Sequence, residues 1–204
     1  ALVSIYIEVV EKKNGVGGLK SDLRSIIEFQ DRAERLKRIQ REGWIRAGVK
    51  KPESVADHSY ACAVLSMMAG DLFGFDTERL IRMALLHDLS ESITGDLTPR
   101  RKRTLGRQVA ILEKQAVRTV VSHLPSKVKK EYIHLIDDYR MQHSRESKFL
   151  RDIDRIEMCI QALAYIRDGH SVRRMVQFLN SAEKDLQTDM GRALFEALRL
   201  DNHV

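Results

Sequence analysis

Residues 54–74 read SVADHSYACAVLSMMAGDLFG, and their apolar positions follow the spacing of an amphipathic helix. Ser54 is a residue type that caps helix N-termini, and Gly74 is one that ends helices. His58 falls on the apolar side of this helix. The positions that share its face carry Ala61, Cys62, Leu65, Met68, Ala69 and Leu72. The pattern therefore predicts a helix that presents an imidazole to the core, where the simplest interpretation is a histidine bonded to a backbone carbonyl.

Helical spacing continues on both sides of this segment. A helix over about 21–41 is predicted to start at Ser21 and to bury one side, which carries Leu23, Ile26, Ile27, Ala33, Leu36 and Ile39. Gly43 and Gly48 mark a loop that carries Trp44, the only tryptophan. A helix from Thr77 to about Ser92 follows, with Leu80, Ala84 and Leu85 on its inner face. Further helices are predicted over about 104–123, 126–140, 146–168, 171–187 and 189–200.

These patterns predict an all-α fold, a compact single-domain bundle of about six to eight helices over residues 19–204. The chain has 204 residues and only three prolines, so long helices are favoured over sheets. Residues 1–18 are interpreted as an N-terminal extension, rich in β-branched residues and without an assigned function.

Composition narrows the functional classes. Cys62 and Cys159 are far apart within apolar helical patterns, so we expect free buried thiols and a cytoplasmic location. No stretch approaches the roughly 20 apolar residues that span a bilayer, and the N-terminus lacks the pattern of a secretory signal. We therefore expect no membrane association.

The net charge of +6 suits either a phosphate-bearing substrate or a nucleic acid. The densest basic run comprises Arg100, Arg101, Lys102, Arg103 and Arg107, and such a run is commonly a solvated surface. A nucleic-acid-binding module is the alternative from a different functional class. Aromatic residues make up only 6% of the chain and are absent from the basic run, which argues against a nucleic-acid partner.

A second cluster changes the interpretation of His58. His87 and Asp88 are adjacent, Glu91 follows three residues after Asp88, and all three can reach one cavity at the end of the helix that begins at Thr77. Ionisable groups on a core-facing side need compensation, because burying unpaired charge is costly. A divalent cation would supply that compensation.

Asp154 adds a carboxylate on the inner stripe of a later helix. The stripe carries Leu150, Met158, Ala162 and Tyr165, among which a lone carboxylate is out of place. An ion pair with Arg151 or Arg155 is the simpler interpretation. Two imidazoles and two carboxylates would instead suit one divalent metal ion, with Mn, Co, Fe, Ni, Zn and Mg as candidates and Ca disfavoured.

The order His58, His87-Asp88, Asp154 resembles the H…HD…D signature of the HD-domain phosphohydrolases. The longer strings PESVADHS (52–59), LHDLSE (86–91) with TGD (94–96), and DRIEM (154–158) are similar to the 5′-deoxynucleotidase branch. Within that branch the chain looks nearest to the HD-domain-containing protein 2 group, over about residues 20–200.

The resemblance implies roles for individual residues. His58, His87, Asp88 and Asp154 would bind the metal, and Glu91 would act as general acid or base. Asp96 would be a catalytic-site residue in contact with the deoxyribose. Trp44 would shape the nucleotide site. The bacterial members carry Arg at the position of Gly43, so a phosphate contact is missing here, and Arg41 or Arg46 would have to replace it. Arg151 stands where the branch usually has Lys.

We therefore expect a metal-dependent phosphohydrolase that converts deoxynucleoside 5′-monophosphates to deoxynucleosides and phosphate. Another nucleotide hydrolase of the same family remains an alternative: a dNTP triphosphohydrolase, a guanosine polyphosphate hydrolase or a cyclic phosphodiesterase. The family also implies a homodimer.

Overall fold

The computed structural model describes residues 16–202, and regular structure within this range is helical apart from one isolated β-bridge between Gln40 and Ser54. The all-α prediction is confirmed, although short segments raise the number of helices above the expected range. The elements are α2 (Val16–Glu34), the 3-10 helix η1 (Arg35–Arg38), α3 (Glu42–Arg46), α4 (Val55–Phe73), α5 (Thr77–Leu86), α6 (Glu91–Thr94), α7 (Pro99–Leu105), α8 (Gln108–Val120), α9 (Ser126–Met141), α10 (Arg145–Arg167), α11 (Val172–Asp185) and α12 (Asp189–Asn202).

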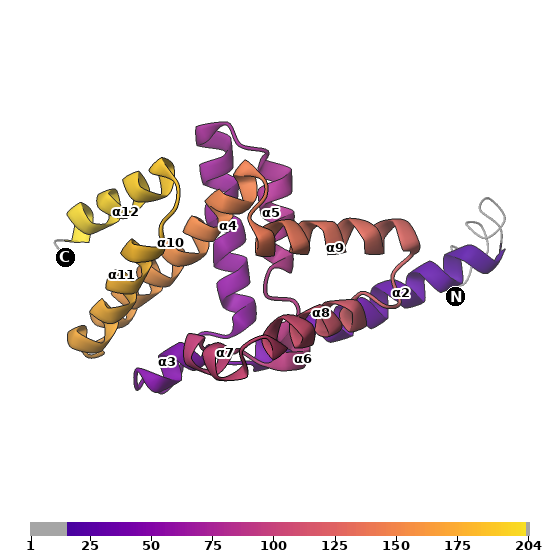
Figure 1. Cartoon of the computed structure of the whole chain (residues 1–204), viewed down its shortest axis with the longest axis horizontal. Helices are drawn as coiled ribbons and strands as arrows, with labels where there is room; N and C mark the ends of the chain where they lie inside the picture. The colour runs from indigo at the N-terminus through magenta and orange to yellow at the C-terminus, as the bar shows by residue number, and fades with distance from the viewer. Residues whose placement is uncertain (1–15, 203–204) are drawn as a thin grey trace, which may run out of the picture.

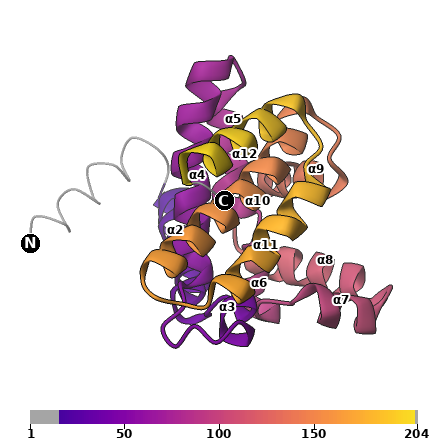
Figure 2. The same ribbon diagram turned by 90° about the vertical axis from the view of Figure 1, so that its left-hand side faces the viewer.

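Helices α4 and α10 form the centre of the molecule (Figure 1). Helix α4 packs against α5 and α10, and α10 also packs against α9, α11 and α12. One cluster of apolar side chains lies around α4, α5 and α9, and a second lies between α10 and α11. The turned view shows α11 and α12 in front of α10, with α7 and α8 to one side (Figure 2). Within residues 16–202, no helix is both long and apolar enough to cross a membrane.

Helix α4 begins and ends where the sequence predicts. The Ser54 hydroxyl accepts a hydrogen bond from the Asp57 N–H, the Asp57 carboxylate accepts one from the Ser54 N–H, and Gly74 adopts a left-handed conformation with φ of 68°. The predicted buried face is wrong toward the C-terminal end, because Met68 and Leu72 are 57% and 72% exposed.

Small residues decide which side of α4 is buried. The face against the core carries Cys62, Ser66, Ala69 and Gly70. A Cβ atom at Gly70 would lie 2.6 Å from Thr77 Oγ1 of α5, so only glycine permits this close approach. The larger Met68 and Leu72 side chains consequently point away from α5.

The start and burial of the first helix are also corrected. Helix α2 already runs from Val16, so Ser21 lies inside it and the predicted boundary at residue 18 falls within the helix. It ends at Glu34 and continues as η1, whereas the predicted helix reached Arg41. Leu36 is buried, but Leu23, Ile26 and Ile27 are at least 40% exposed, because α2 extends beyond the helices it packs against (Figure 1). The remainder of the predicted extension lies outside the described residues.

The segment that carries the His-Asp pair is shorter than predicted. Asp76, and not Thr77, caps α5, since its carboxylate accepts a hydrogen bond from the Arg79 N–H. The helix ends at Leu86 and not near Ser92, and residues 87–90 form turns that lead into α6. Leu85 is 50% exposed, in contrast to its predicted inner position.

Two further predictions are corrected. The predicted helix over 104–123 corresponds mainly to α8, and its first two residues belong to α7, because the chain turns at Gly106 with φ of 52°. Trp44 lies in the short helix α3 and not in a loop. The predicted helices from 126 onward match α9, α10, α11 and α12 to within about two residues.

A buried carboxylate joins α9 to the start of α10. Asp138 accepts hydrogen bonds from the Ser144 N–H and hydroxyl, and from the Arg79 guanidinium at 2.6 Å. Burial alone raises the pKa of Asp138, but these hydrogen bonds outweigh burial and lower the pKa to about 2.

Candidate functional site

Four buried side chains meet between α4, the end of α5 and α10. One nitrogen, sulfur or oxygen atom from each of His58, Cys62, His87 and Asp154 lies within 4.8 Å of the others. Asp88 lies beside them, with Oδ2 3.2 Å from His87 Nε2 and 3.9 Å from His58 Nε2. The structure thus brings together the histidines and carboxylates that the sequence singles out.

His58 is held by Glu157. Its Nδ1 lies 2.5 Å from a Glu157 carboxylate oxygen, and because a carboxylate accepts, Nδ1 carries the proton. When the ring is neutral, Nε2 therefore carries the lone pair, and this atom lies 3.2 Å from Asp154 Oδ1. The simple interpretation of a histidine bonded to a backbone carbonyl does not describe His58.

His87 is oriented in a similar way. Its Nδ1–H donates a 2.7 Å hydrogen bond to the Ala84 carbonyl, so Nε2 is the ring nitrogen that carries the lone pair when the imidazole is neutral. This Nε2 is buried and makes no hydrogen bond with any described residue. A buried lone pair without a donor is costly unless a cation occupies the space in front of it.

Asp154 and Asp88 are both held ionised. The Tyr139 hydroxyl donates to Asp154 at 3.0 Å, and the hydrogen bond and charge that His58 supplies when it is protonated keep the pKa of Asp154 low despite burial. Arg41 lies 3.2 Å from Asp88, and the charges of protonated His87 and of Arg41 likewise outweigh burial and hold the pKa of Asp88 below its ordinary value.

The ion pairs proposed as the simpler explanation of Asp154 are weak. Arg151 lies 3.8 Å from Asp154, whereas Arg155 pairs with Asp185.

The donor set fits a divalent cation. The Nε2 atoms of two imidazoles, each with a lone pair when its ring is neutral, face two ionised carboxylates, a combination that suits borderline first-row metals. Cys62 is the weakest candidate of the group, because burial raises the pKa of its thiol to about 12 and a thiol binds metals as the thiolate. Glu157 fixes His58 from behind, as outer carboxylates do in metal sites.

A cavity of about 760 Å³ opens on this cluster. Glu91 lies in its wall with Oε2 buried and without a hydrogen bond to a described residue. Burial, together with the negative charges of Asp88 and Asp96, raises the pKa of Glu91 well above its ordinary value. Glu91 is therefore protonated at neutral pH and can donate a proton into the cavity.

Of the predicted substrate contacts Asp96, Arg41 and Arg46, the first two line the cavity and the third does not. Asp96 lines the cavity and accepts a 2.7 Å hydrogen bond from the Glu42 N–H. Arg41 also lines the cavity. Arg46 does not, because it turns outward on α3 and pairs with Glu42. The structure thus distinguishes between the two arginines that the sequence left open.

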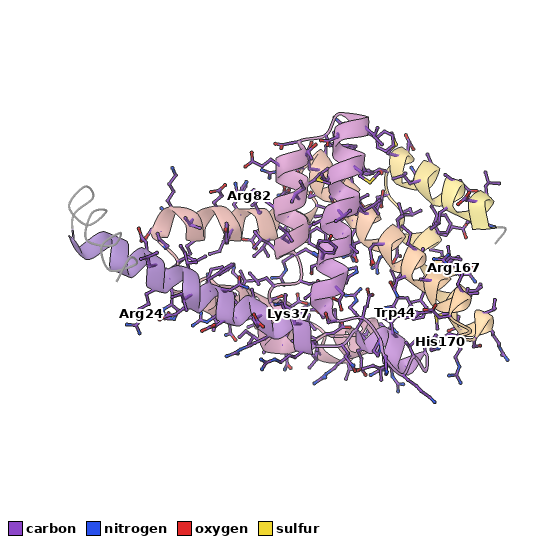
Figure 3. All side chains as sticks on the ribbon, turned by 180° about the vertical axis from the view of Figure 1, so that it is seen from behind. Arg24, Lys37, Trp44, Arg82, Arg167 and His170 are labelled. Carbon is purple, nitrogen blue, oxygen red and sulfur yellow. The ribbon has the colours of Figure 1, made fainter. Side chains whose placement is uncertain are left out.

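Trp44 lies in the cavity wall where α3 approaches α10 and α11, and Figure 3 shows it near the N-terminal end of α4. Its indole N–H donates to Glu53 at 2.8 Å, and its ring packs on Tyr165 and Phe178 at 5.2 Å and 4.2 Å. Trp44 is only 2% exposed, so it supports the wall more than it faces the cavity.

Several residues of the site were missed in the sequence. Glu157 follows Asp154 by three positions on α10, so its place on the same helix face was a usable signal. Tyr139 and Phe178 come from helices whose packing no local pattern specifies. Lys102 and Arg103, part of the basic run interpreted as a solvated surface, line the cavity.

The fold and site define a helical domain with a histidine and carboxylate centre of the metal-dependent type. The sequence model of the HD domain matches residues 33–193, and the chain belongs to this family.

The chain is similar to curated members of this family. It is 37% identical over 165 residues to the 5′-deoxynucleotidase HDDC2 of Xenopus laevis, covering 81% of each chain. It is 35% identical over 161 residues to the 5′-deoxynucleotidase HDDC2 of Homo sapiens, covering 78% of this chain and 76% of the human one.

Solved structures show the same fold. A conserved hypothetical protein from Pyrococcus furiosus superposes with a TM-score of 0.70 at 30% sequence identity, over 85% of this chain and 98% of the other. The PH0347 protein from Pyrococcus horikoshii superposes with a TM-score of 0.71 at 26% identity, over 86% and 97%.

Proposed function

We propose that this chain is a metal-dependent 5′-deoxynucleotidase, which hydrolyses deoxynucleoside 5′-monophosphates to deoxynucleosides and phosphate. The observation that carries the proposal is the convergence of the Nε2 atoms of two imidazoles with two carboxylates at one end of a cavity that also holds a protonated carboxyl group. The substrate class comes from relatives that share 35–37% of their aligned residues and are 5′-deoxynucleotidases.

His58, His87, Asp88 and Asp154 are the proposed metal ligands. A divalent cation held by these residues would supply Lewis-acid polarisation of a phosphoryl oxygen and a water of lowered pKa for attack on phosphorus at neutral pH. Glu157 and the Ala84 carbonyl keep the two imidazole rings in the orientation that directs Nε2 toward this centre.

Glu91 is the proposed proton donor. Hydrolysis forms a bond from the water oxygen to phosphorus and breaks the bond from phosphorus to the 5′-oxygen, which needs a proton as it leaves. A carboxyl group kept neutral by burial and by Asp88 and Asp96 can supply that proton. General acid catalysis of this kind contributes roughly 10²- to 10⁴-fold in rate.

Arg41 and Asp96 are the proposed substrate contacts near the phosphate and the sugar. Arg41 stays cationic, because the charges of Asp88 and Asp154 raise its pKa against the effect of burial. Its position in the cavity wall lets it offset charge on the phosphoryl group. Asp96 is fixed by the backbone of Glu42, so its second oxygen is free to accept from a sugar hydroxyl.

The test is phosphate release from dNMPs, NMPs, dNTPs and cyclic nucleotides by metal-stripped protein supplemented in turn with Mn, Co, Mg and Zn. Metal-dependent release from dNMPs supports the proposal, and release from dNTPs or cyclic nucleotides alone contradicts it. Asp88→Ala should lose bound metal and activity together, whereas Glu91→Gln should keep the metal and lose turnover. The homodimer and the cytoplasmic location stay predictions.

A further inference from the structure

The two ends of the cavity differ in chemistry. The end between α3, α10 and α11 is lined by the aromatic and apolar side chains of Trp44, Met158 and Phe178, with Gln177 and Ser181 at its rim and Arg155 as a charged group. The end between α7, α8 and α9 is densely charged and is lined by Lys102, Arg103, Glu113 and Arg140. A nucleotide whose phosphate lies at the histidine and carboxylate cluster must direct its base toward one of these ends.

We propose that the end formed by α3, α10 and α11 is the nucleobase subsite, with Phe178 as the aromatic surface on which the base stacks. This inference rests on the proposed function. A nucleobase is uncharged and has a π face, and stacking on an aromatic side chain stabilises it whatever its identity.

The charged end is a poor site for an uncharged base. Lys102 and Arg140 both form ion pairs with Glu113, and the Lys102 pair has a distance of 3.1 Å. An uncharged base placed there would remove water from these charged groups and could not replace it with an opposite charge.

Phe178 lies beside Gly43 of α3. A Cβ atom at position 43 would lie 3.4 Å from Phe178 Cε1, which is van der Waals contact, so the phenyl ring packs against this part of α3. The ring centre lies 4.2 Å from that of Trp44 with the planes tilted by 42°. Trp44 is buried beneath it and Phe178 is only half-buried, so Phe178 offers the accessible aromatic surface.

Arg155 adds a hydrogen-bond donor at this end. One of its terminal nitrogens lies 3.5 Å from Asp185, but its Nε is buried and makes no hydrogen bond with a described residue. The Gln177 amide and the Ser181 hydroxyl are exposed at the rim. These groups can form hydrogen bonds with the carbonyl oxygens and ring nitrogens at the edge of a base. The buried Arg155 Nε in particular has no acceptor among the described residues, and a base could provide one.

The experiment compares dAMP with 2-deoxyribose 5-phosphate, which keeps the phosphate and the sugar but has no base. We expect the wild-type kcat/KM to be higher for dAMP. Phe178→Ala should lower the ratio of the two kcat/KM values about tenfold, which corresponds to about 1.4 kcal/mol of lost stacking. Phe178→Tyr keeps an aromatic ring and should restore most of the ratio.

Tyr60→Ala is the matched control, because this aromatic side chain is 69% exposed on α4 and lies outside the cavity wall, so it should leave the ratio unchanged. A parallel fall on both substrates in Phe178→Ala would mean a purely structural role and would overturn the subsite. A ratio that responds to Arg103→Ala and not to Phe178→Ala would place the base at the charged end and overturn it as well. If wild-type protein releases phosphate from neither substrate, the proposed function itself fails.

Discussion

Replacing Glu157 by Ala perturbs the proposed metal centre without replacing any of the proposed metal ligands. Glu157 is 4% exposed and accepts from His58 Nδ1 at 2.5 Å, so its removal leaves a buried N–H without an acceptor and a ring without a fixed orientation. Loss of such an outer carboxylate lowers metal affinity by roughly 10- to 100-fold, which is about 1.4–2.8 kcal/mol.

The same change affects folding less strongly. An unsatisfied buried N–H costs roughly 1–3 kcal/mol. Glu157 also repels the part-buried Glu53 carboxylate, whose pKa is raised by desolvation and by that repulsion. Because Glu157→Ala removes the repulsion, we expect the loss in free energy of unfolding to lie near 1 kcal/mol.

The assay titrates metal-stripped protein with Mn²⁺ by calorimetry and measures urea unfolding in the absence of metal. Glu157→Gln keeps an acceptor oxygen, so its Kd for Mn²⁺ and its stability in urea should be closer to the wild-type values than those of Glu157→Ala. Glu196→Ala removes a carboxylate with 60% exposure on α12 and serves as the control with unchanged affinity. An unchanged Kd for Mn²⁺ in a folded Glu157→Ala protein would refute the assignment of His58 as a ligand held by Glu157.

Three further predictions concern single side chains. A Cβ atom at Gly191 would collide with the buried Asp152 carboxylate, 2.6 Å from its Cγ. Gly191→Ala should therefore lower the free energy of unfolding by roughly 1–3 kcal/mol. A variant with wild-type stability in urea would contradict this close packing. Because the folded-state pKa of Asp138 is lowered to about 2, its stabilisation is present above pH 4 and is lost as pH falls toward 2. Asp138→Asn should therefore cost about 2 kcal/mol at pH 7 and much less near pH 2, and a cost independent of pH would show that its charge is unimportant. The raised pKa of Glu91 predicts that kcat declines as pH rises through that pKa, since the donor loses its proton. Glu91→Gln should lower kcat roughly 10²- to 10⁴-fold and abolish this decline, and a persisting alkaline decline would assign the proton to another group.

The sequence determines the helices most clearly where capping chemistry is local. Ser54 and Gly74 bound α4 because a hydroxyl that accepts from the helix N-terminus and a residue that tolerates positive φ act within a few residues. The types and spacing of His58, His87-Asp88 and Asp154 likewise predict a metal centre, because buried imidazoles and carboxylates need a common partner.

Only the tertiary structure decides which neighbour each face meets. Helical periodicity placed Met68 and Leu72 inside, but the close contact between Gly70 and Thr77 turned a face of small residues toward α5 instead. The sequence also did not distinguish Arg41 from Arg46 as a phosphate contact. Arg41, just before α3, lines the cavity, whereas Arg46 on α3 pairs with Glu42 at the surface.

The same limit applies to the groups that complete the site. Glu157 lies 99 positions from His58 in the sequence, and Phe178 comes from α11, far along the chain from Trp44 of α3 on which its ring packs. Local propensity acts within a turn or two of helix, whereas these contacts depend on how whole helices pack. The sequence by itself therefore determined the helices and the metal-binding chemistry, and the packing of α10 and α11 against α3 and α4 decided the orientation of His58 and the shape of the cavity.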